Sequence, residues 1–251
     1  MKRFLLAGLM AAGLVQGQSG KRVLVYTRTT VTEKSSYVHD NIAASVEALR
    51  GIGAAKGFAV DASDDPGVFT REKLREYRAI IFTSTNNEAF TTDEQRQAFQ
   101  YFIEHGGGLV GLHAATTTEK QWPFFVGVMG GRFARHPKLQ KFTVQVVDAH
   151  HPATRGMPAS FAWEDECYFH DSLSPNLHIL LATDPSALDD PDKGKFPDSM
   201  VGKVLPLAWT LTRNGSRTFY TALGHQKERY SDPFLVKHIQ GGLLWVMGKE
   251  K

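Results

Sequence analysis

The sequence of 251 residues contains a single cysteine, Cys167, so no disulfide can form within the chain. A domain of this size can bury a core large enough to be stable without one. No Cys-His signature surrounds Cys167, which argues against a catalytic thiol. The GxSxG nucleophile elbow and the Walker phosphate-binding loop are also absent. These absences disfavour the common acyl hydrolases and P-loop nucleotide hydrolases.

Long apolar runs are also missing. The apolar stretch from Phe4 to Val15 is too short to span a bilayer, and it follows the basic pair Lys2 and Arg3. Val15 and Gly17 are small enough for a signal-peptidase site, and no cysteine nearby could accept a lipid. This pattern predicts an export signal over residues 1–20, with cleavage after Gly17. The mature protein is therefore expected in the periplasm or outside the cell, without membrane attachment.

The chain has no strong charge of either sign. Its formal net charge is +3, and its 42% hydrophobic and 22% charged residues are ordinary for a globular protein. Because the basic residues are scattered, nucleic acid is not an expected partner. Residues 21–251 are expected to form one domain that binds a small molecule. Assembly into a homo-oligomer is compatible with the sequence.

Strand and helix patterns alternate in the first half of this domain. Thr92 with Gln95 forms a capping box, and Asp40 is the expected N-cap of the first helix. Alternation of this kind predicts a three-layer α/β/α fold with a mainly parallel central sheet. The expected strands are 21–27, 58–62, 79–83 and 109–112, and the expected helices are 40–52, 70–77 and 92–105.

The second half changes to strands and loops after a short helix at 121–131. Residues 184–198 are rich in Pro, Asp and Lys, which predicts a mobile surface loop. Asp232 and Pro233 open a last helix that runs to about Met247 and covers the sheet. The extra strands are expected at 142–147, 162–168, 179–183, 207–211 and 218–222.

The segment GGGLVGLHAA, residues 106–115, is the most informative stretch. Its glycines end a helix, a buried strand follows, and His113 stands where that strand must stop. Ligands of open α/β sheets collect at the carboxyl ends of the strands. His113 occupies the place of a nucleophile elbow but cannot act there as serine or cysteine would, so we expect a different chemistry at this position.

Ten histidines are present, and several stand beside polar groups in apolar surroundings. Neutral imidazoles with a carboxylate are ligands for one divalent metal ion, and His113, His225 and Glu166 are the candidates. The same groups could instead act as general acids and bases. A third alternative is that they are hydrogen-bonded loop residues. No compact signature such as HExxH decides between these interpretations.

From Lys21 to Gly248 the chain resembles the trehalose-utilisation (ThuA-like) family. The segments that carry the resemblance are VHDNI, GGGLVGLHAATTTEKQWPFF, FARHPKLQ, HPAT, WEDECY, PLAWT and FYTALGH. The resemblance implies a fold similar to the class I glutamine amidotransferases and flavodoxin, without the amidotransferase triad. It also implies a role in carbohydrate catabolism, on 3-keto sugars or glycosides. Where the family often has a large apolar or aromatic residue, this chain has Cys167.

The family's polar positions correspond to specific residues of this chain. His113, Glu166 and His225 are the predicted catalytic residues, with Glu166 as a base whose pKa is raised by its apolar neighbours. The expected chemistry is elimination, hydration or isomerisation beside a ketone, by a lyase, an isomerase or a glycoside-processing hydrolase. The predicted substrate-binding residues are His39, Asp40, His136, Asp165, Tyr168 and Trp122.

The alternative from another class is a sugar-binding protein without catalytic activity. In that case aromatic side chains would stack on the sugar, and the histidines would only hydrogen-bond to its hydroxyls. The aromatic residues that could do so are Trp122, Trp163, Phe124 and Tyr168.

Overall fold

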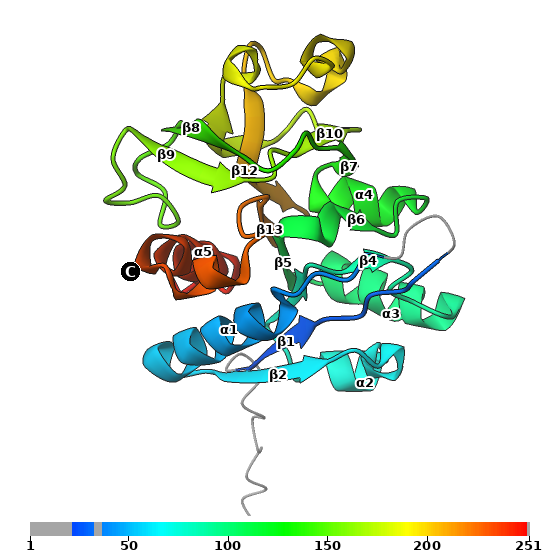
Figure 1. Cartoon of the computed structure of the whole chain (residues 1–251). Helices are drawn as coiled ribbons and strands as arrows, with labels where there is room; N and C mark the ends of the chain where they lie inside the picture. The colour runs from blue at the N-terminus through cyan, green and yellow to red at the C-terminus, as the bar shows by residue number, and fades with distance from the viewer. Residues whose placement is uncertain (1–21, 33–36, 250–251) are drawn as a thin grey trace, which may run out of the picture.

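The computed structural model describes residues 22–32 and 37–249, so the predicted export signal lies outside the described residues. A central sheet separates two layers of helices (Figure 1). Helices α1 (Ile42–Lys56) and α5 (Pro233–Val246) cover one face. Helices α2 (Arg71–Leu74), α3 (Asp93–Glu104) and α4 (Pro123–Met129) lie on the other. The predicted three-layer α/β/α architecture is confirmed.

The sheet has nine strands in the order β2-β1-β3-β5-β13-β12-β11-β8-β9. Its first five strands run parallel, and the expected neighbours are adjacent or next to adjacent. These strands are β2 (Ala59–Ser63), β1 (Arg22–Tyr26), β3 (Ala79–Thr83), β5 (Gly108–Leu112) and β13 (Ser216–Thr221). Their carboxyl ends therefore share one edge of the sheet, as predicted from the alternation of elements.

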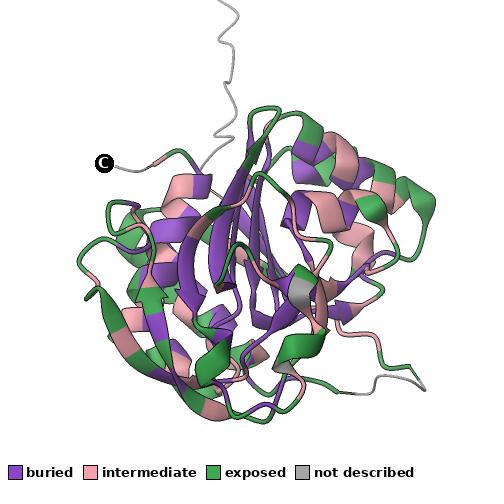
Figure 2. Cartoon of the chain, turned by 90° about the horizontal axis from the view of Figure 1, so that it is seen from above, coloured by how far each residue is buried: buried purple, intermediate pink, exposed green. Residues whose placement is uncertain are grey.

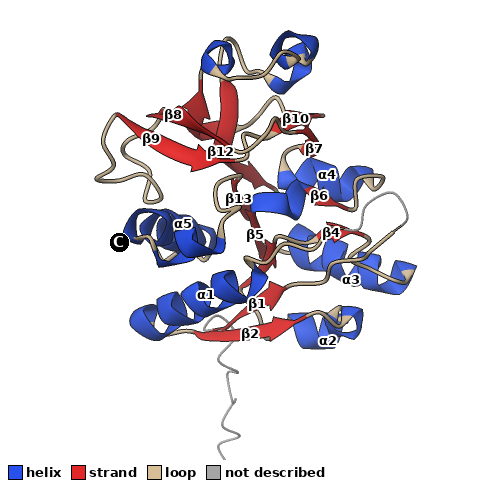
Figure 3. Cartoon of the chain, viewed as in Figure 1, coloured by secondary structure: helices blue, strands red, loops and turns tan. Residues whose placement is uncertain are grey.

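The extra strands of the second half extend this sheet in antiparallel pairs. They are β12 (Leu205–Arg213), β11 (His178–Thr183), β8 (Gln140–Val146) and β9 (Ser160–Asp165). Two small sheets complete the fold (Figure 3), one of β4 (Asn86–Asn87) with β6 (Thr117–Thr118) and one of β7 (Arg132–Arg135) with β10 (Phe169–Asp171).

The hydrophobic core is divided by the sheet into two parts. The apolar stripes of α1 and α5 pack on one face, for example through Leu49 and Leu243. Phe99 of α3 and Phe125 of α4 pack on the other. The central strands are buried on both faces (Figure 2), which explains why they are continuous apolar runs in the sequence.

The helix caps confirm two predictions and correct a third. Thr92 forms the capping box with Gln95, and the Asp232 side chain accepts from the N–H of Phe234 at the start of α5. The prediction that Asp40 caps the first helix is wrong, because Asn41 is the N-cap and no side-chain cap bond forms there. Asp40 is exposed, and its carboxylate lies 3.1 Å from Lys227 Nζ.

The segment 184–198, predicted as a mobile surface loop, contains short helical turns. Three short 3-10 turns follow one another at Pro185–Ala187, Lys193–Lys195 and Pro197–Ser199. The buried carboxylate of Asp190 accepts two hydrogen bonds from the Arg135 guanidinium, at 2.7 and 2.8 Å. A bidentate pair of this kind anchors the segment to β7. Among the described residues, no helix is both long and apolar enough to cross a membrane.

Candidate functional site

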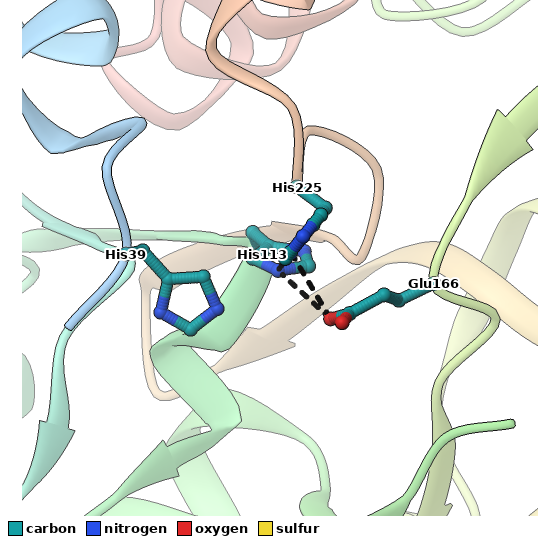
Figure 4. Close-up of side chains that lie close together, drawn as sticks. All are labelled: His39, His113, Glu166 and His225. Atoms are coloured by element: carbon teal, nitrogen blue, oxygen red, sulfur yellow. Dashed lines mark hydrogen bonds and ion pairs between the residues drawn. The ribbon is translucent and has the colours of Figure 1, made fainter. Parts of the chain in front are cut away.

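Four side chains from distant parts of the chain meet at the carboxyl edge of the sheet (Figure 4). His39 precedes α1, His113 follows β5, Glu166 follows β9 and His225 follows β13. Each offers one nitrogen or oxygen atom, and these atoms all lie within 4.8 Å of one another. The structure therefore brings together the three predicted catalytic residues and His39.

His113 is held in an unusual backbone conformation. Its φ of 50° lies in the left-handed region, at the point where β5 gives way to a 3-10 turn, His113–Thr116. Such a conformation is uncommon outside glycine and persists only when the surroundings fix it. The Tyr220 hydroxyl donates to the carbonyl of His113 at 2.8 Å, and His113 Nδ1 lies 2.8 Å from the carbonyl of Ala222. Because a carbonyl only accepts, Nδ1 carries the proton and Nε2 faces the site.

Glu166 is the acidic centre of the cluster. Its Oε2 lies 3.2 Å from His225 Nδ1 and 3.6 Å from His113 Nε2, while Oε1 lies 3.6 Å from His136 Nε2. The hydroxyl of Tyr168 is 2.9 Å from His113 Nε2. One carboxylate thus faces three imidazoles, and a phenol that can donate a hydrogen bond lies beside them.

Asp165 does not face this group, although it was predicted to bind substrate. Its carboxylate is buried and accepts four hydrogen bonds, from Trp163 Nε1 and from the backbone N–H groups of Glu166, Gly224 and His225, at 2.7 to 3.1 Å. All of its contacts position other residues. Asp165 therefore joins the loop that carries Glu166 to the loop that carries His225.

The strand predicted at 162–168 ends three residues earlier than expected, and the hydrogen bonds of Asp165 explain why. β9 stops at Asp165, because the carboxylate of Asp165 turns back to accept the N–H of Glu166. Three strands separate β9 from β13 in the sheet order. Four spacings of about 4.8 Å would place them roughly 19 Å apart in a flat sheet. The bond of 2.7 Å from Gly224 to Asp165 therefore requires the antiparallel half to curve back over the site.

Asn41 is a site residue that the sequence analysis missed. Its side-chain amide donates to the carbonyls of Gly224 and His225, at 2.7 and 3.1 Å. These bonds tie the segment that carries His39 to the loop that carries His225. The only sequence signal was its place beside His39 in VHDNI, which also fits a helix cap.

The electrostatics of Glu166 are opposite to the expectation. Burial raises the pKa of its carboxyl, but the nearby imidazoles of His113, His225 and His136 outweigh burial. The net effect holds the pKa of Glu166 well below its usual range. The prediction of a raised pKa considered only the apolar neighbours and is wrong, since the sequence could not show three histidines around this group. Glu166 is an ionised carboxylate at neutral pH.

The pKa values of the surrounding groups are shifted in different directions. Burial, with the like charges of His113 and His225, lowers the pKa of His39 to about 3, so its imidazole is neutral at pH 7. Hydrogen bonding to Glu166 raises the pKa of His225 despite partial burial. Burial and the charge of Glu166 hold the pKa of Tyr168 well above its usual value. His225 is therefore suited to donate a proton, and Tyr168 is suited to donate a hydrogen bond.

A cavity of about 400 Å³ opens beside the cluster. His39, His136, Glu166 and Tyr168 line it, together with two aromatic and two polar residues that were not predicted: Tyr37, Phe133, Asn86 and Thr117. This volume lies in the usual range for small-molecule sites. The predicted substrate-binding residues His136 and Tyr168 thus face the cavity.

Other predicted site residues lie elsewhere. Asp40 is on the surface with Lys227, and Trp122 lines a neighbouring polar cavity that shares Thr117 with the first. Of the aromatic residues proposed to stack on sugar, Trp163 is buried against Asp165 and Phe124 packs on Phe99 and Trp122; only Tyr168 faces the cavity beside the cluster.

Cys167 is also buried, and burial raises the pKa of its thiol. A thiol in this state is a poor nucleophile, because the thiolate is the reactive form.

A family model described as ThuA, trehalose utilisation, matches residues 22–246 of the chain. No curated protein matches it.

Solved structures show the same fold. A ThuA-like protein from Bacteroides uniformis is 26% identical with a TM-score of 0.70, and the match covers 94% of this chain and 95% of that one. For a ThuA-like protein from Parabacteroides merdae the identity is 19% and the TM-score 0.68, with 92% of each chain covered. A β-galactosidase from Rahnella sp. R3 shares the fold over 92% of this chain and 32% of its own, at 13% identity and a TM-score of 0.54.

Proposed function

The chain belongs to the ThuA, trehalose utilisation, family, and from this premise we propose that it is an enzyme acting on a 3-keto sugar or glycoside. The observation that carries the proposal is the position of Glu166. Its ionised carboxylate faces three histidines at the edge of a cavity of small-molecule size. Groups with separated pKa values in one cleft are typical of acid–base catalysis.

The proposed chemistry is a proton transfer beside a ketone. A carbonyl makes the neighbouring C–H acidic, so a base can remove that proton if the developing enolate oxygen is stabilised. Glu166 is placed to take the proton. His225 and Tyr168 are placed to donate hydrogen bonds to the oxygen. This apparatus serves elimination, hydration and isomerisation, since each of them moves a proton on such a carbon.

The substitution Glu166→Gln tests this role. Glutamine keeps the shape of the side chain but cannot accept the proton, so we expect turnover to fall by about 10²–10⁴-fold. Conversion of 3-ketotrehalose, followed by chromatography of the products, is the measurement, with calorimetric binding of the same sugar to show that the pocket is intact.

Glu164→Gln is the matched control. Glu164 lies on β9 two residues earlier, with its carboxylate 4.0 Å from Lys141 Nζ and away from the cluster, so this variant should turn over normally. Normal turnover by Glu166→Gln would refute the base role. Binding of the sugar without any turnover by the wild-type protein would instead support the sugar-binding alternative.

The proposal includes export to the periplasm or the medium, because residues 1–20 have the pattern of a signal peptide. The protein secreted by its host should lack about the first 17 to 20 residues by intact mass. Full-length protein in the cytoplasm would contradict this part. The proposed binding partner is a carbohydrate-derived small molecule. Light scattering would measure whether the chain associates with further copies of itself.

A further inference from the structure

We propose that His39, His113, His225 and Glu166 hold one divalent transition-metal ion of the zinc type. Their four donor atoms lie within 4.8 Å of one another. The inference rests on the proposed function for the role of the ion in a reaction. Binding of the ion itself can be tested without any reaction.

Three of the donor atoms already have the spacing of a coordination sphere. His225 Nδ1 lies 3.2 Å from Glu166 Oε2, His113 Nε2 lies 3.3 Å from His225 Nδ1, and His113 Nε2 lies 3.6 Å from Glu166 Oε2. Ligands at about 2.0–2.2 Å from a tetrahedral zinc ion are roughly 3.3–3.6 Å apart. These three atoms therefore form one face of such a tetrahedron almost without moving.

The hydrogen bonding of His113 matches that of a metal ligand. Its Nδ1–H donates to the backbone carbonyl of Ala222 at 2.8 Å, which leaves the lone pair of Nε2 directed at the cluster. Metal-bound histidines commonly donate their other N–H to a carbonyl or carboxylate in this way. Tyr168 now donates to the same lone pair at 2.9 Å, so an incoming ion has to displace this hydrogen bond, together with the one between His225 and Glu166 and its proton.

His39 supplies the fourth donor. The residue is only 8% exposed. The ring lies edge-on to that of His113, with their centroids 4.8 Å apart, and it points toward the cluster (Figure 4). Coordination by His39 explains why a further buried imidazole lies within 4.8 Å of the donor atoms of His113, His225 and Glu166.

The donor set selects the class of ion. Mg²⁺ and Ca²⁺ prefer oxygen ligands, whereas three imidazoles with one carboxylate suit Zn²⁺ and its first-row neighbours. Two of the four ligands, His39 and Glu166, also line the cavity of about 400 Å³. An ion there is open to a further oxygen ligand from that cavity. Such an ion would polarise a carbonyl oxygen, which is the oxygen that the proposed reaction must stabilise, and it would there replace the hydrogen bond from His225. Glu166 would hold the ion through Oε2 and keep Oε1 for the proton.

The test is titration of the full chain, freed of metal with a chelator, with Zn²⁺ by calorimetry and with Co²⁺ by visible absorption. We expect one equivalent of each ion to bind per chain. The protein loaded with Co²⁺ should show the visible absorption of cobalt bound by few ligands, most of them nitrogen. His39→Ala and the isosteric Glu166→Gln should each weaken Zn²⁺ binding by at least about 10–100-fold, the range found for loss of a mere second-shell partner. His178→Ala is the control and should bind normally, because this exposed imidazole pairs with Asp148 away from the site.

The inference is overturned if the wild-type protein binds no Zn²⁺, or if His39→Ala and Glu166→Gln both bind as tightly as the wild type. These outcomes are separable from those of the proposed function. Turnover of 3-ketotrehalose by metal-free protein would show that the reaction does not need the ion, and it would leave the acid–base proposal unchanged. Tight, His39-dependent binding of Zn²⁺, together with full turnover by Glu166→Gln, would support the metal site and refute the role of Glu166 as the base.

Discussion

Asp165 offers the most direct test of how the site is assembled, through the substitution Asp165→Asn. In the native protein one carboxylate oxygen accepts the N–H groups of Glu166 and His225, and the other accepts Trp163 Nε1 and the N–H of Gly224. Asparagine has the same shape but replaces one oxygen with an NH₂ group. Whichever way the amide is turned, two of the four donors then face another donor.

The magnitude follows from these two lost acceptors. A buried donor left without its partner costs about 1–3 kcal/mol. Two of them should therefore lower the free energy of unfolding by about 2–6 kcal/mol. For a domain of 150–250 residues, each kcal/mol shifts the melting temperature by about 2–4 °C. We therefore expect the melting temperature of Asp165→Asn to fall by at least about 4 °C.

Differential scanning calorimetry measures this shift, with Asp61→Asn as the control. Asp61 pairs with Arg22 at 2.8 Å, but both side chains are more than a third exposed, and such surface pairs contribute about 0–1 kcal/mol. Because Asp165 also positions Glu166 and His225, the folded variant should bind Zn²⁺ more weakly than the Asp61 variant. A melting temperature within about 2 °C of the wild type, with unchanged Zn²⁺ affinity, would refute the reasoning.

Two further substitutions test other buried groups. Burial lowers the pKa of His238 to about 4, so the unfolded chain binds a proton below pH 6.5 that the folded protein does not. Stability should therefore be fully present above pH 6.5 and fall by about 2 kcal/mol at pH 5. His238→Gln should remove this part of the loss in urea unfolding, and an unchanged pH profile would contradict the assignment. Tyr220→Phe removes the hydroxyl that donates to the carbonyl of His113. We expect a loss of about 1–3 kcal/mol in unfolding and weaker Zn²⁺ binding, whereas a loss in stability alone would leave Tyr220 without a role in placing His113.

The sequence by itself determined the layers and half of the sheet. Apolar runs such as 79–83 and 108–112 are strands because both of their faces are covered, and the capping box at Thr92 begins α3 where the pattern predicted it. Parallel strands joined by helices place their carboxyl ends together, so the position of His113 at that edge could be predicted. These features depend on local periodicity and on a connection rule of fixed hand.

Only the tertiary structure decided how the second half meets that edge. Glu166 follows β9 and His225 follows β13, and three strands separate these two in the sheet. The curvature that brings the two residues together is not encoded in any local pattern. The same holds for Asp165, whose four hydrogen bonds distinguish it from its neighbour Glu166 although both are acids in one run of residues. A pKa depends on every charge and donor within a few ångströms, so the low pKa of Glu166 became visible only once three histidines surrounded it.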